Sequence, residues 1–103
     1  TAGGWAAMDA RRGHVLWTTP DPLGARAEAP VSSANGVVFG CSKNAQGTLY
    51  ALHADTGAVL WSFDSGGPCH AGASVADGWV FWGTGTFISP GGPRKLNAFS
   101  LSP

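Results

Sequence analysis

Few residues in this chain could do acid–base or nucleophilic chemistry. Of its six Asp and Glu residues, Asp9, Asp55 and Asp77 fall in predicted tight turns, where aspartate commonly forms the turn itself. His14 and His53 flank predicted hairpin turns on the same face, which favours surface roles over a general base. No Gly-x-Ser-x-Gly elbow, phosphate-binding loop or zinc-type spacing occurs. The sequence therefore predicts no catalytic set of a conventional kind.

The two cysteines are the other reactive groups. Cys69 and His70, in the string GGPCH, form half of a c-type haem attachment motif, which requires Cys-x-x-Cys-His. Position 66 is Gly, so the first thioether bond cannot form and we expect no haem c site. Cys41 and Cys69 could instead form a disulfide, or both could be reduced and packed. A disulfide closing a loop of this size would stabilise the fold by roughly 3 kcal/mol or more.

Composition limits the classes of partner. The 103 residues correspond to about one small domain, and 44% of them are apolar. Only 12% are charged, with a formal net charge of zero, so nucleic acid is not an expected partner. No apolar run approaches the roughly 18 residues that span a bilayer, so we expect no membrane span. The opening string TAGGWAAM has no signal-peptide pattern.

Glycine and proline punctuate the chain at regular intervals. The 16 Gly and 7 Pro residues separate short apolar runs, which is typical of many short strands and tight turns. We therefore predict an all-β fold. AMDARRGHVLW, beginning at Ala7, and ALHADTGAVLW, beginning at Ala51, are nearly the same string, 44 residues apart. A period of roughly 40–50 residues indicates propeller blades.

The repeat divides the chain into antiparallel units of up to four strands. A complete blade is expected over 29–63, with strands at 29–34, 37–41, 48–53 and 58–63 and an Asn-Gly hairpin turn at 35–36. Residues 1–19 supply the last two strands of the preceding blade, and 71–103 three strands of the final one. Together they form one fragment of a single propeller domain, about two blades in all. Trp17 and Trp61 are expected to fill the wedges between neighbouring sheets.

The repeated string resembles the blade-docking motif Ala-x-Asp-x-x-Thr-Gly-x-x-x-Trp of quinoprotein (PQQ-dependent) alcohol dehydrogenase propellers. The first copy has Arg12 in place of Thr, the second has His53 in place of Asp, and the third has Ser100 in place of Asp. Non-catalytic outer-membrane assembly scaffolds and some sensor domains carry similar repeats. The matching positions, which we expect to be structural, are Ala7, Asp9, Gly13, Trp17, Ala51, Thr56, Gly57, Trp61 and Ala98.

Residues 64–101 are similar to the C-terminal end of polyvinyl-alcohol-dehydrogenase-type quinoproteins. The strings Trp-Gly-Thr-Gly at 82–85 and Ala-Phe-Ser-Leu at 98–101 carry this resemblance. It implies that the chain is part of a larger, eight-bladed propeller, whose last blade is completed by a strand from the far N-terminus. The remaining blades would then be its partners. Alone, the segment is expected to be inactive and to self-associate, because its terminal sheets lack neighbours.

The resemblance implies a PQQ- and calcium-dependent alcohol dehydrogenase, in which hydride passes from an alcohol to the quinone. Arg94 and Lys95 are the candidates to pair with the carboxylates of that cofactor. The catalytic base and the calcium ligands are expected in blades outside this segment. The alternative is a non-catalytic propeller that acts as a protein–protein assembly scaffold or a sensor domain. A periplasmic or secreted location is implied by the same resemblance.

Overall fold

The computed structural model describes residues 3–84 and 95–100, and for Lys95 it describes the backbone alone. The described chain folds into three antiparallel sheets and contains no helix. The first sheet has the strands β1 (Gly4–Met8) and β2 (Val15–Pro20). The second has β3 (Ser32–Ala34), β4 (Val37–Cys41), β5 (Thr48–His53) and β6 (Val59–Asp64). The third has β7 (Ser74–Ala76), β8 (Trp79–Thr84) and β9 (Lys95–Ser100).

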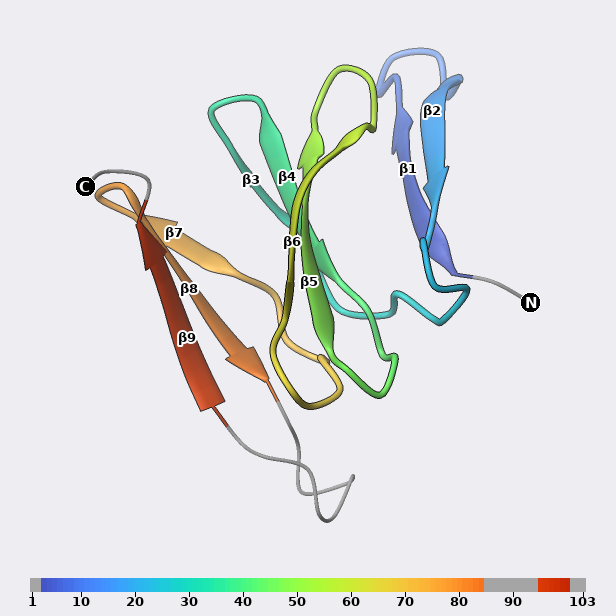
Figure 1. The fold of residues 1–103 in the computed structure, drawn as a ribbon. Coiled ribbons are helices and arrows are strands. Elements are labelled where there is room, and N and C mark those ends of the chain that lie inside the picture. Colours follow the sequence, from blue (N-terminus) through green and yellow to red (C-terminus); the bar gives the residue numbers. More distant parts are fainter. Residues whose placement is uncertain (1–2, 85–94, 101–103) are drawn as a thin grey trace.

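Each sheet is a meander, because the strands pair in the order in which they occur in the sequence. The three sheets lie next to one another in chain order, and β3 of the second sheet contacts β7 of the third (Figure 1). The predicted all-β architecture of propeller blades is confirmed. The inner strands are shorter than the predicted 29–34 and 71–76. Pro30 lacks the N–H that a ladder hydrogen bond requires, so the regular pairing of β3 begins only at Ser32.

The hairpin turns carry the conformations that their sequences predict. Asn35 and Gly36 both have positive φ, at 52° and 77°, as a tight two-residue hairpin turn requires. Asp77 and Gly78 repeat this geometry, with φ values of 51° and 80°. Ala54 N–H donates to Gly36 O at 2.8 Å, so the β3–β4 and β5–β6 turns lie together at one end of the second sheet.

Two apolar clusters lie between the sheets. Trp5, Tyr50 and Leu52 form the cluster between the first and second sheets, with Trp17 and Val38 packed against them. The cluster between the second and third sheets contains Cys41, Leu49, Cys69, Ala73 and Trp82. Each blade therefore buries apolar side chains on the face that meets its neighbour, as stacked repeats require.

Candidate functional site

The contact between the first two sheets is built from the C-terminal part of the repeated motif. Trp17, on β2, donates its indole N–H to Ala54 O of the β5–β6 turn at 2.8 Å. Thr19 Oγ1 donates to Gly57 O in the same turn at 2.5 Å. Gly57 has φ +78°, and a Cβ added there would lie 2.4 Å from the Trp17 ring. Glycine is therefore favoured at position 57 for two reasons: its backbone has positive φ, and the Trp17 ring occupies the space that a Cβ would need.

The N-terminal part of the motif shapes the hairpin itself. Ala7 is the cross-strand partner of Trp17, and Ala51 is the partner of Trp61. Asp9 Oδ1 accepts the Arg11 N–H at 2.9 Å. His53, which replaces Asp in the second copy, accepts the equivalent N–H of Asp55 through Nδ1 at 3.1 Å. The substitution therefore preserves the turn, because an imidazole nitrogen can accept the same hydrogen bond as a carboxylate.

The second tryptophan of the motif has a different environment from the first. Trp61 is 38% exposed and packs edge-to-face on Phe99 of the third sheet, with the ring centroids 4.9 Å apart. The hairpin that would correspond to 54–57 begins at position 101, outside the described residues. Ala98, the third copy of the motif alanine, is the cross-strand partner of Phe81.

Sequence reasoning missed Trp5, a buried tryptophan between the first two sheets. It is 8% exposed and packs edge-to-face on Tyr50, with the ring centroids 5.3 Å apart. A Cβ at Gly40 would lie 2.4 Å from Trp5 Nε1, so the absence of a side chain at Gly40 makes room for the ring. Trp5 occupies the repeat position of the buried Leu49, and this alignment is the signal that could have identified it.

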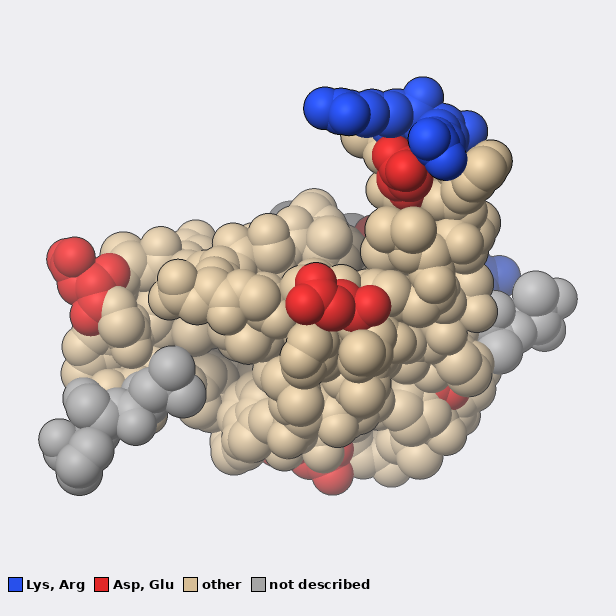
Figure 2. Space-filling model, turned by 90° about the horizontal axis from the view of Figure 1, so that it is seen from above, with Lys and Arg blue, Asp and Glu red and all other residues tan. Residues whose placement is uncertain are grey.

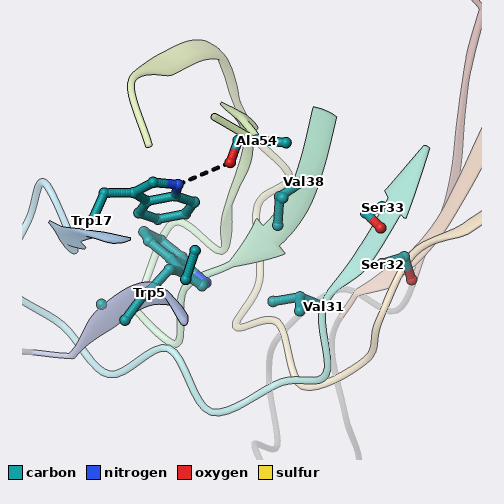
Figure 3. Close-up of a pocket in the computed structure, with 10 residues that line it drawn as sticks. Trp5, Trp17, Val31, Ser32, Ser33, Val38 and Ala54 are labelled. Atoms are coloured by element: carbon teal, nitrogen blue, oxygen red, sulfur yellow. Dashed lines mark hydrogen bonds between the residues drawn. The ribbon is translucent and has the colours of Figure 1, made fainter. Parts of the chain in front are cut away.

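A groove of about 390 Å³ runs between the first and second sheets. Trp5 and Trp17 form one wall, and Val31, Val38 and the two serines of β3 form the other (Figure 3). It lies along β1, which pairs with β2 on one edge and with no described strand on the other. In the second sheet β4 takes the equivalent place beside β5.

The longer loops at the other end of the sheets carry a small ionic cluster. Lys43 Nζ lies 2.9 Å and Arg26 Nη1 lies 3.4 Å from the Glu28 carboxylate. The Lys43 hydrogen bond and charge lower the pKa of Glu28 below its ordinary value, and the charge of Arg26 adds to the effect. Arg26 and Glu28 are exposed and Lys43 is half-buried, so these pairs contribute little to the free energy of unfolding.

A network of polar side chains lies at the same end of the second sheet, near the longer loops. Thr48 Oγ1 donates to Asp64 Oδ1 at 2.8 Å and accepts from Asn44 Nδ2 at 3.0 Å. Asp21 is 4% exposed; its Oδ1 accepts the Leu23 N–H, while its Oδ2 is buried with no partner among the described residues. Burial, and then the negative charge of Asp21, raise the pKa of Tyr50.

Cys41 and Cys69 form a disulfide with an S–S distance of 2.09 Å. It joins the end of β4 to the loop that leads into the third sheet, and both residues are 1% exposed or less. Next to it, Trp82 donates its indole N–H to Ala71 O at 2.9 Å. The disulfide and this hydrogen bond together fix the start of the third blade against the second.

The two residues expected to contact a quinone cofactor fall outside the described side chains. No group of three or more His, Cys, Asp or Glu side chains converges within residues 3–84 and 95–100 in a way that could hold a metal ion. Of the two cofactor candidates, Arg94 lies outside the described residues and the side chain of Lys95 is likewise not described. Arg26 and Lys43, on the same loop face, are both engaged by Glu28.

The fold and the interlocking hairpins define a β-propeller built from PQQ-like repeats. Residues 2–94 match the family model described as outer membrane protein assembly factor BamB, and the chain belongs to this family of PQQ-like repeats. The crystal structure of BamB from Moraxella catarrhalis is similar, with a TM-score of 0.69 and 24% sequence identity over 80% of this chain. The chain spans 25% of the length of that BamB chain. A search of the curated proteins returns no match. None of the described segments forms a helix long and apolar enough to cross a membrane.

Proposed function

We propose that the chain is part of a larger propeller that acts as a non-catalytic scaffold for protein assembly. The single observation that carries this proposal is the family match over residues 2–94, since that family is described as an assembly factor. The construction of the chain supports it: the repeated hairpins are used to dock one blade on the next, and the described residues offer no converged metal-binding group.

The remaining blades of the propeller are proposed as the first partners. The outward face of the third sheet exposes Trp79 at 44%, Phe81 at 38% and Leu96 at 75%. Phe81 and Leu96 occupy the repeat positions of Phe39 and Leu49, which the third sheet covers in the second blade. A further blade would cover the outward face in the same way. Without it, the 103-residue chain would self-associate through this surface.

A periplasmic or secreted location is also proposed. The support is the disulfide between Cys41 and Cys69, because disulfides form and persist in oxidising compartments and are rare in the cytosol.

The experiment that tests the proposed function compares assembly with catalysis. The protein is purified from its source by an affinity tag after chemical cross-linking, and PQQ with calcium is added to the same preparation with an alcohol and an artificial dye. We expect a partner complex of fixed stoichiometry that re-forms from the separated components, and no dye reduction. Alcohol-dependent dye reduction that requires both PQQ and calcium would instead establish a quinoprotein dehydrogenase and overturn the scaffold proposal.

A further inference from the structure

The tip of the β1–β2 hairpin carries two adjacent arginines that pair with none of the described carboxylates. Of the six Lys and Arg residues, Arg26 and Lys43 are paired with Glu28, and the side chains of Arg94 and Lys95 are not described. Arg11 and Arg12 are exposed and form no ion pair with any described carboxylate. In Figure 2 a cluster of Lys and Arg side chains projects from the end of the molecule where this hairpin lies.

The fold does not require arginine at this tip. The β5–β6 hairpin has the same backbone, with Gly57 N–H donating to His53 O at 2.8 Å and Gly13 N–H donating to Asp9 O at 2.7 Å. At the two tip positions the second hairpin has Asp55 and Thr56. The opposite charge at one of these positions therefore builds an equivalent turn.

Arg12 also lacks a hydrogen bond that the corresponding residue of the β5–β6 hairpin makes. Thr56 Oγ1 accepts the Ala58 N–H at 3.2 Å within the turn. A guanidinium has no acceptor, so Arg12 cannot replace this hydrogen bond. A residue that departs from its own repeat and gives up a local contact points to a role outside the hairpin.

The arginines would stay exposed in a complete propeller. The β5–β6 hairpin is already docked by Trp17, and its Gly57 is buried, yet Asp55 and Thr56 remain exposed. Arg11 and Arg12 occupy the same positions, so a preceding blade that docked on the first hairpin would leave them at the surface.

We propose that Arg11 and Arg12 bind a carboxylate-rich segment of a partner protein. Guanidinium groups suit this ligand because they bind carboxylates with two parallel hydrogen bonds. A membrane surface or a nucleic acid is a poorer fit. The neighbouring turns of the same face carry Asp55 and Asp77, which would repel a polyanion long enough to run across that face, whereas a short acidic segment can contact the arginine tip alone. Figure 2 shows acidic side chains elsewhere on the molecule and also directly beside the basic cluster. The inference rests on the proposed scaffold function, whose partner it describes.

The test measures the binding of fluorescent penta-glutamate to the purified protein by anisotropy, with penta-glutamine as the uncharged control. The first variant, Arg11→Asp with Arg12→Thr, places the tip residues of the β5–β6 hairpin at the tip of the β1–β2 hairpin. It should fold normally, because the β5–β6 hairpin forms the same turn with these residues. The second variant adds Asp55→Arg and Thr56→Arg, which moves the arginine pair to the second hairpin and restores the composition. Circular dichroism confirms the fold of each variant.

We expect the first variant to bind penta-glutamate about tenfold more weakly, as for the loss of two exposed ion pairs. The second variant should recover the affinity, and added salt should weaken both complexes that retain the arginine pair. Equal binding of penta-glutamate by the parent and the first variant would overturn the inference. So would arginine-dependent binding to phosphatidylglycerol vesicles or to an oligonucleotide in place of the peptide.

The failure of this inference is distinguishable from failure of the scaffold proposal. If the first variant re-forms the cross-linked partner complex as well as the parent does, the arginines are not the contact, while the scaffold function stands. If the parent itself forms no complex, the scaffold proposal fails whatever the peptide result.

Discussion

The replacement of Gly57 by alanine tests how the first two blades interlock. Gly57 has φ +78°, and the left-handed conformation costs a non-glycine residue about 1–2 kcal/mol. Its new Cβ would lie 2.4 Å from the Trp17 ring, so the indole must move. Movement of the ring breaks its hydrogen bond to Ala54 O, which contributes a further 0.5–1.5 kcal/mol or so. We expect Gly57→Ala to lower the free energy of unfolding by about 1.5–3.5 kcal/mol.

Gly13 provides the matched control. It occupies the same repeat position, with φ +71°, but no atom lies within 4 Å of the place where its Cβ would be. Gly13→Ala should therefore lower the free energy of unfolding only by the cost of holding alanine in the left-handed backbone conformation, about 1–2 kcal/mol. The difference between the two variants isolates the contact with Trp17.

The assay is urea unfolding followed by tryptophan fluorescence, at two protein concentrations so that self-association is visible. Trp17→Phe, alone and combined with Gly57→Ala, completes a double-mutant cycle. Because phenylalanine is smaller and lacks the N–H, the cost of Gly57→Ala should fall toward that of Gly13→Ala in this background. Equal destabilisation by the two glycine substitutions in the parent chain would refute the docking role assigned to Gly57.

Three further outcomes are expected. Cys41→Ser should lower the free energy of unfolding by about 3.5 kcal/mol, because the disulfide spans a sequence separation of 28; an unchanged urea midpoint would show that the cross-link is not formed in the purified protein. The absorbance of the single tyrosine should titrate above pH 10, and Asp21→Asn should bring the pKa of Tyr50 closer to its ordinary value. Because the folded state raises the pKa of Tyr50, the stability contributed by its neutral phenol is fully present below the pKa of an unfolded tyrosine and is lost as the pH rises through the folded-state pKa. An identical tyrosine titration in the parent and in Asp21→Asn would show that the Asp21 charge does not raise this pKa. Gly47→Ala should lower the midpoint temperature of thermal unfolding far more than Gly24→Ala. Both glycines have positive φ, but only a Cβ at Gly47 would overlap a neighbouring atom, the Gly67 carbonyl oxygen at 1.6 Å.

Much of the fold could be predicted from local sequence signals. The Asn-Gly pair at 35–36 and the repeated Gly of the hairpins identify turns because few other residues tolerate their backbone angles. The repeat then arranges the strands in sequential meanders, since each unit can bury its apolar face only against the next. The late start of β3 was not predicted, because it depends on where Pro30 interrupts pairing with β4.

The candidate site was harder to predict because its residues are distant in sequence. Trp17 could be assigned to a wedge between blades, but its donation to Ala54 O joins residues 37 positions apart. Trp5 was missed because it has no counterpart of its own type in the second copy, where Leu49 takes its place. The resemblance to quinoproteins indicated the repeat, while the family match favours the scaffold alternative.

The sequence by itself determined the period, the all-β class and the positions of the tight turns, because these follow from backbone preferences and side-chain patterns within a few residues. Only the tertiary structure decided which hairpins are covered and which are free. Gly13 and Gly57 have the same local conformation, yet one stands in open space and the other lies beneath an indole ring. The physical reason is that burial belongs to the contact between blades, which joins residues far apart in the sequence.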